Sequence, residues 1–179
     1  AIRQKASRGE LQYLLPVGFC WTSGGKIEID PDRRVQQAIQ LVFAKMIELG
    51  SARQVLMWFR REGVSLPALP PDPVERKMLW KLPVYQSVLG ILTNPVYAGA
   101  YAYGKTEART TMVNGRARKT VGHRKPRDQW RVLIPDHHPG YISWEQFERN
   151  QATLAQNTHM KSRMEPKAGR GGRALLAGL

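Results

Sequence analysis

The sequence contains one cysteine, few acidic residues and no long apolar run, and each shortage excludes a class of protein. Cys20 alone permits neither a disulfide within the chain nor a zinc site built from cysteines. Its position between Phe19 and Trp21 indicates a buried or half-buried thiol rather than a nucleophile. No apolar stretch approaches the ~20 residues of a membrane-spanning helix, and the first residues lack the apolar segment of a signal peptide.

The shortage of acids leaves a strongly basic chain. Against 28 lysines and arginines stand only 14 acidic residues, which gives a net charge of +14 over 179 residues. Half of this excess lies in residues 101–131, where nine basic residues face two acids. Such a charge favours a polyanionic partner, nucleic acid first and an anionic membrane second. The 42% apolar content is enough for an ordinary core, so we expect a folded chain of about one domain.

Residues 32–49 are predicted to form the first helix. Asp30 is the expected cap, Pro31 suits the first helical position, and Gly50 follows the end of the pattern. Apolar residues recur at the spacing of one helical face, and a polar face lies opposite. The residues predicted to face the core are Val35, Ala38, Ile39, Val42, Phe43, Met46 and Ile47.

Two further helices are predicted. Residues 52–62 begin after a capping box formed by Ser51 and Gln54. A proline-rich loop at residues 67–73 is expected to be extended and exposed. The third helix is expected between residues 83 and 93. Inward-facing positions in these two helices are Ala52, Val55, Leu56 and Phe59, and then Val84, Val88, Ile91 and Leu92.

The strands are expected to be short. Residues 17–29 indicate a hairpin that turns at a serine and two glycines. Tyr97, Tyr101 and Tyr103 alternate with alanines and predict a strand with one aromatic face. Asn114-Gly115 predicts the turn of a basic hairpin or loop within residues 105–129.

After this basic segment, the pattern predicts a returning strand and a last helix. Trp130, Val132 and Ile134 alternate, and a capping box at Ser143 opens a helix of residues 144–156. The fold class is therefore α+β, with a helix-turn-helix-like core of at least three helices, a small sheet and a basic hairpin. We expect three parts: a basic arm (residues 1–13), a folded domain (residues 14–156) and a linker (residues 157–179).

The third predicted helix is a candidate for reading DNA bases. A recognition helix of this type lies in the major groove, where glutamine pairs with adenine and a glycine permits close approach. The alternative is a helical bundle with a solvated face, and the long segment between residues 63 and 81 departs from the usual short turn. The candidate residues are Lys81, Tyr85, Gln86, Gly90 and Thr93.

The basic segment is a second candidate, because lysine and arginine neutralise phosphates and release counterions. Such contacts fix position and carry little sequence information. The alternative is a solvated loop. The candidate residues are Lys105, Arg109, Arg116, Arg118, Lys119, Arg124, Lys125 and Arg127.

The basic arm is a third candidate. Arg3, Lys5 and Arg8 would suit the narrow minor groove, and the alternative is a disordered terminus. Other chemistry has weaker support. Asp136-His137-His138 suggests metal ligands, but adjacent histidines in an extended segment point apart, which favours a plain loop. Glu28, Asp30 and Asp32 are the carboxylates of an alternative Mg²⁺-dependent nuclease.

Several segments taken in order carry a family resemblance. They are PVGF (residues 16–19), IDPD (29–32), Phe43, GSAR (50–53) and ILTNPVYAGAYAY (91–103). Together they resemble the "recombinase" domain of the large serine site-specific DNA recombinases, from about residue 8 to residue 179. The resemblance implies a double-stranded DNA-binding module that follows a catalytic domain absent from this chain, so no serine here is assigned as catalytic and we expect no catalytic centre.

The resemblance also implies neighbours on both sides. Residues 1–8 match the end of a long helix that crosses the minor groove, and residues 174–179 match the stretch before a four-cysteine zinc ribbon. We therefore expect no cofactor or zinc in this fragment. The full protein would act as a dimer on each site and a tetramer at synapsis, while the fragment would be monomeric.

The function expected from sequence is recognition of an attachment or recombination site in double-stranded DNA, within a bacterial or phage-encoded cytoplasmic protein and without a membrane partner. The alternative from another class is a stand-alone winged-helix-like transcription regulator or nucleoid protein.

Overall fold

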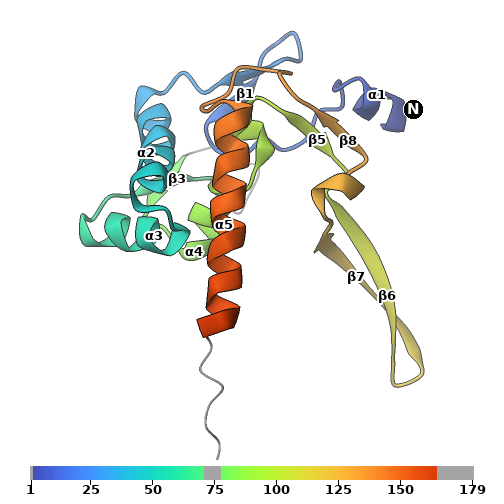
Figure 1. Cartoon of the computed structure of the whole chain (residues 1–179). Helices are drawn as coiled ribbons and strands as arrows, with labels where there is room; N and C mark the ends of the chain where they lie inside the picture. Colours follow the sequence, from blue (N-terminus) through green and yellow to red (C-terminus); the bar gives the residue numbers. More distant parts are fainter. Residues whose placement is uncertain (1, 71–77, 165–179) are drawn as a thin grey trace, which may run out of the picture.

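The computed structural model describes residues 2–70 and 78–164, with side chains as far as residue 158. This part contains five α-helices and four two-stranded antiparallel sheets, arranged as a helical body from which one hairpin projects (Figure 1). The α+β class predicted from sequence is confirmed. In the described residues, no helix is both long and apolar enough to cross a membrane.

Helix α2 (Arg33–Leu49) contributes one apolar face to the core of the body. Six of the seven apolar residues predicted to face inward are buried, because one face of the helix carries them all. Ile47 is the exception and is 63% exposed. The cap is Asp32 rather than Asp30: the Asp32 carboxylate accepts from the Arg34 amide, whereas the Asp30 carboxylate accepts from the Asp32 amide, two residues earlier.

Helices α3 (Ala52–Arg61) and α4 (Tyr85–Leu92) pack with α2 into a three-helix core. The capping box predicted at Ser51 is not formed, because the Ser51 side chain makes no capping hydrogen bond. Leu56 is only half-buried. Val84 lies outside the α4 helix as its N-cap and is exposed, whereas Val88, Ile91 and Leu92 face the core as predicted.

Two small hairpins flank this core. Strands β1 (Phe19–Trp21) and β2 (Ile27–Ile29) form the predicted first hairpin. The segment between α3 and α4 contains a second, β3 (Leu66–Ala68) with β4 (Leu79–Lys81), which sequence reasoning missed because its strand contains a proline. Pro67 is buried, so the start of the proline-rich segment is not exposed; residues 71–77 lie outside the described residues.

Tyrosine hydroxyls connect the N-terminal segment to the rest of the body. Tyr97 lies in a 3₁₀ turn (Pro95–Ala98), not in the predicted strand, because Asn94 caps that turn and Gly99 ends it. Strand β5 (Tyr101–Tyr103) pairs with the predicted returning strand β8 (Val132–Ile134). The hydroxyls of Tyr97, Tyr101 and Tyr141 donate to the carbonyls of Val17, Leu11 and Gly18, respectively.

The chain begins and ends in helices within the described part. Helix α1 (Ile2–Ser7) is short, and α5 (Trp144–Met164) extends eight residues beyond the predicted end. The Ser143 hydroxyl caps α5 by accepting from the Gln146 amide. The Gln146 side chain bonds Asn150 instead of returning to the cap, so only half of the predicted box forms.

Candidate nucleic-acid interface

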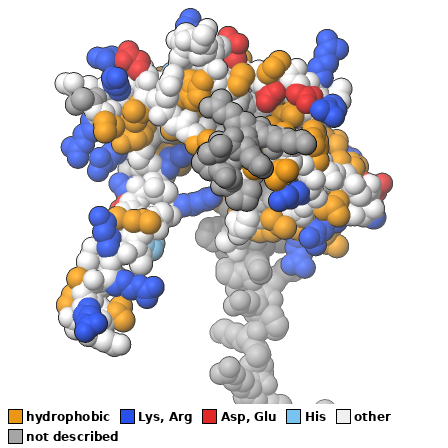
Figure 2. Space-filling model, turned by 180° about the vertical axis from the view of Figure 1, so that it is seen from behind, with side chains coloured by type: hydrophobic (Ala, Val, Ile, Leu, Met, Phe, Trp, Pro, Cys, Tyr) orange, Lys and Arg blue, Asp and Glu red, His pale blue; other side chains and the backbone are white. Residues whose placement is uncertain are grey.

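The most basic segment of the chain forms a projecting two-stranded ribbon. Strands β6 (Thr106–Val113) and β7 (Arg116–Arg124) pair with each other, and no third strand of the described part joins them. Asn114 and Gly115 both have positive φ, at 51° and 75°, as the two-residue turn predicted from sequence requires. The ribbon extends away from the helical body (Figure 1), and basic side chains stand out along it (Figure 2).

The register divides the ribbon into two faces, because side chains alternate along each strand and paired residues share a face. We call one the arginine face; it contains Glu107, Arg109, Thr111, Val113, Arg116, Arg118, Thr120 and His123. We call the other the methionine face; it contains Thr106, Ala108, Thr110, Met112, Ala117, Lys119, Val121 and Arg124. The strand register shifts between positions 107 and 109 of β6, because β7 has a bulge there at Val121-Gly122. Gly122 has a φ of 84°.

The base of the ribbon is fixed to the body. The Lys125 amide donates to the Lys105 carbonyl, and the Trp130 indole donates to the Lys125 carbonyl. Arg127 forms an ion pair with Glu148 of α5 and lies over the Trp144 ring. These contacts set the direction of the ribbon relative to α5.

The predicted basic residues therefore separate into two groups. Arg116, Arg118, Lys119 and Arg124 are exposed and form no ion pair among the described residues. Arg109 is also exposed but is paired with Glu107, whose pKa falls because of this bond. Three other basic residues lie at the base of the ribbon: Lys105, Lys125 and Arg127. Of these, Arg127 is paired with Glu148 of α5.

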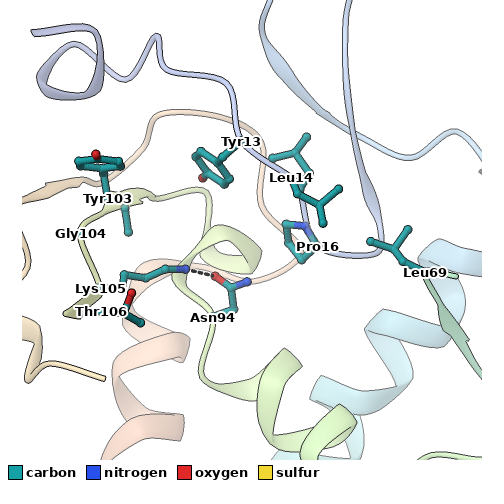
Figure 3. Close-up of a pocket in the computed structure, with 11 residues that line it drawn as sticks. Tyr13, Leu14, Pro16, Leu69, Asn94, Tyr103, Gly104, Lys105 and Thr106 are labelled. Carbon is teal, nitrogen blue, oxygen red and sulfur yellow. Dashed lines mark hydrogen bonds between the residues drawn. The ribbon is translucent and has the colours of Figure 1, made fainter. Parts of the chain in front are cut away.

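Lys105 points into a cavity instead of toward solvent. The cavity has a volume of about 550 Å³ and lies between the segment of residues 13–16 and the base of the ribbon (Figure 3). The ammonium group donates to Asn94 Oδ1 over 3.4 Å. Burial lowers the pKa of Lys105, and the nearby charge of Arg124 lowers it further. Lys105 is thus poorly placed for the phosphate contact predicted from sequence.

The candidate base-reading helix is only partly available. Lys81 is exposed at the end of β4, and Tyr85 and Gln86 are exposed at the start of α4. Open space lies beside Gly90, so this position could approach a partner closely. Thr93, however, is half-buried. Its hydroxyl, the group predicted to contact DNA, donates to the Leu89 carbonyl.

Sequence reasoning missed a second basic surface on α3. Arg53, Arg60 and Arg61 all lie on its exposed side, and α3 packs against α4. The signal was present, because the face opposite the buried residues of this helix is rich in arginine. Arg60 donates to the Pro83 carbonyl and Arg61 pairs with Glu62, so both side chains also have local partners.

The basic arm lies apart from these surfaces. Arg3 and Lys5 are exposed on α1, whereas Arg8 pairs with Glu10. In Figure 1, α1 lies beyond β5 and β8, on the opposite side of the molecule from α3 and α4. The structure therefore does not gather the three predicted sets into one patch.

Of the remaining sequence candidates, Asp30, Asp32 and the two histidines have structural partners, whereas Glu28 is exposed on β2. Asp32 caps α2 and binds Arg34, which lowers the pKa of its carboxyl, and Asp30 bonds within the same turn. His137 and His138 do not point apart as predicted: their Nδ1 atoms lie 3.1 Å apart. His138 Nε2 donates to the Val96 carbonyl, so its Nδ1 accepts from His137 in the neutral pair. No cluster of three or more metal-ligating side chains occurs among the described residues.

This histidine pair gives a prediction about stability. Burial lowers the pKa of His138 below the value of an unfolded histidine. The unfolded chain therefore binds more protons, and the free energy of unfolding should fall as the pH drops below about 6.5. We expect His138→Gln, which keeps a donor for the Val96 carbonyl, to flatten this dependence. Urea unfolding of both proteins between pH 5 and 8 measures it, and equal slopes would contradict the assignment.

Comparisons with known proteins found a matching family model, a curated relative and two solved structures of similar fold. A family model described as "Recombinase" matches residues 33–157. The protein y4bA/y4pH of Sinorhizobium fredii is 41% identical over 179 residues, which is 99% of this chain and 25% of that protein. The chain thus spans about a quarter of this curated relative.

Two solved structures share the fold, each with a TM-score of 0.54 and 17% identity. One is described as "Crystal Structure of a LSR-DNA Complex"; the match covers 87% of this chain and 37% of that one. The other, "Sequence Requirements of the Listeria innocua prophage attP site", matches 92% of this chain and 55% of that one.

Proposed function

This chain belongs to the Recombinase family, and we propose that it binds double-stranded DNA to recognise a recombination or attachment site. The observation that carries the proposal is the exposed ribbon, on which four unpaired cations project from the body. Such a surface attracts a polyanion over a distance and gains affinity by releasing counterions. The similarity in fold to a structure described as an LSR–DNA complex supports the same partner.

The proposed role is that of a targeting domain. We infer that cutting and rejoining of DNA belong to another part of a serine recombinase, and that the zinc ribbon implied by the sequence resemblance also lies outside this chain. In this scheme the domain of residues 14–156 holds a half-site beside the crossover, and the full protein assembles as a dimer on each site and a tetramer at synapsis. The described ion pair and cap account for Asp32 and Asp30, two of the three carboxylates that would otherwise suggest a nuclease.

The direct test is a titration of the chain with labelled duplexes at 50 to 300 mM salt, with and without Mg²⁺. We expect the logarithm of the binding constant to fall linearly with the logarithm of the salt concentration. Six phosphate contacts would give a slope of about −5. A preference for one half-site and intact DNA after incubation with Mg²⁺ are expected as well. Binding that ignores salt would contradict the proposal, and Mg²⁺-dependent nicking would favour the nuclease instead.

A further inference from the structure

The shape of the ribbon restricts how it can meet a duplex. Two paired strands lie ~4.8 Å apart, and their side chains extend above and below the sheet. The major groove is ≈ 12 Å wide and admits a two-stranded ribbon, whereas the minor groove is ≈ 6 Å wide. From Thr106 to Val113 the ribbon spans on the order of 24 Å, so it can follow the groove over several base pairs.

The two faces differ in what they offer to base edges. The arginine face places Thr111 opposite Arg118 and Val113 opposite Arg116. The methionine face places Met112 opposite Ala117, and its Met112 and Val121 are 69% and 76% exposed. Guanidinium groups donate to the acceptors of guanine in a bidentate manner, while methionine and valine offer no hydrogen bond. The methionine face also carries Lys119, which is a point charge without the planar fork, and Arg124, which lies at the base of the ribbon opposite Thr106. Bidentate readout near the turn therefore belongs to the arginine face.

Two arginines on this face are free for such contacts. Arg116 and Arg118 form no hydrogen bond or ion pair within the described part of the chain, whereas Arg109 is held by Glu107. Since the two residues are separated by two positions on one strand, their side chains emerge about 7 Å apart. That spacing corresponds to base pairs that are adjacent or next but one in the groove.

We propose that the β6–β7 ribbon enters the major groove with its arginine face toward the bases, and that Arg116 and Arg118 determine specificity by reading two nearby guanines. This inference rests on the proposed DNA binding. It assigns base readout to a segment whose charge alone suggests only phosphate contacts. Among the candidates on the sequence-predicted reading helix, only Thr93 has its hydroxyl bonded to a backbone carbonyl, that of Leu89.

Selection of binding sites from a randomised duplex pool tests the proposal. Wild-type protein should enrich one sequence. Arg118→Ala should lose about 5- to 150-fold discrimination at one base pair and keep its preference elsewhere. Arg116→Ala should do the same at a position one or two base pairs away. Arg118→Lys keeps the charge but not the planar fork, so it should retain the salt slope and lose discrimination.

Lys119→Ala is the matched control, because Lys119 adjoins Arg118 and is also exposed but lies on the methionine face. It should weaken binding to all sequences alike and reduce the salt slope by about 0.9. If Arg118→Ala behaves like Lys119→Ala, Arg118 is a phosphate contact and the inference is overturned. Wild-type binding without any sequence preference overturns it too but leaves duplex binding intact. Absence of salt-dependent binding removes both proposals.

Discussion

Gly140→Ala should destabilise the protein by about 3 kcal/mol or more, because the added methyl group would meet backbone atoms. A Cβ at this position would lie 2.6 Å from the Gly99 nitrogen, 2.8 Å from the Ala98 carbonyl carbon and 2.9 Å from the Tyr97 oxygen. All three neighbours are backbone atoms, which cannot rotate away as a flexible side chain would. Two segments must therefore separate where they now touch.

The separation would break hydrogen bonds that hold the body together. At this crossing, the amides of His137 and His138 both donate to the Gly99 carbonyl, and the amides of Tyr141 and Ile142 both donate to the Tyr97 carbonyl. These hydrogen bonds connect the 3₁₀ turn after α4 to the segment before α5. Breaking them would therefore destabilise the packing of both elements. Thermal unfolding should show a midpoint lowered by on the order of 10 °C.

Gly90→Ala is the control for this experiment. Gly90 lies inside α4, and nothing is within 4 Å of a Cβ placed there. Because alanine restricts the unfolded chain and favours helix, this variant should be more stable than wild type by about 0.5–1 kcal/mol. A Gly140→Ala protein with the same thermal midpoint as the wild type would show that the two segments do not pack as tightly as described.

The Gly90→Ala variant also tests a candidate DNA contact. If its DNA affinity is unchanged, Gly90 is removed from the candidate contacts.

The parts of the fold that sequence predicted are those with a local cause. Helix α2 follows from its apolar periodicity, and the β6–β7 turn follows from Asn114-Gly115, since both signals lie within a few residues of the structure that they determine. The predicted N-cap of α2, Asp30, was wrong because Asp30 and Asp32 carry the same carboxylate two residues apart. Local sequence does not decide which carboxylate reaches the free amides.

The parts that sequence did not predict depend on distant partners. Tyr97 alternates correctly for a strand, but its hydroxyl bonds a carbonyl 80 residues earlier and its backbone forms a 3₁₀ turn. Lys105 belongs by composition to the basic segment, yet the fold directs it into a cavity toward Asn94. Charge density showed which segment is the most basic, whereas the separation of free cations from paired ones required the positions of Glu107 and Glu148.

The ribbon itself should be removable with little cost to the rest of the fold and a large cost to DNA binding. The Lys125 amide donates to the Lys105 carbonyl over 2.9 Å, so a two-residue Asn-Gly turn can join these positions in place of residues 106–124. The thermal midpoint should stay near that of the wild type, because the removed residues are nearly all exposed and pair with each other.

Duplex affinity of this shortened protein should fall by on the order of 10²-fold at ~0.1 M salt, and the salt slope should decrease by about 2 to 4, because four free cations are lost. A second variant keeps the ribbon but replaces Arg116, Arg118, Lys119 and Arg124 with glutamine. If charge carries the binding, both variants should lose similar affinity, because the glutamine ribbon retains the shape without the cations. Wild-type affinity in the shortened protein would instead place the duplex on α3, the end of β4 and the start of α4, where Arg53, Lys81 and Gln86 are exposed.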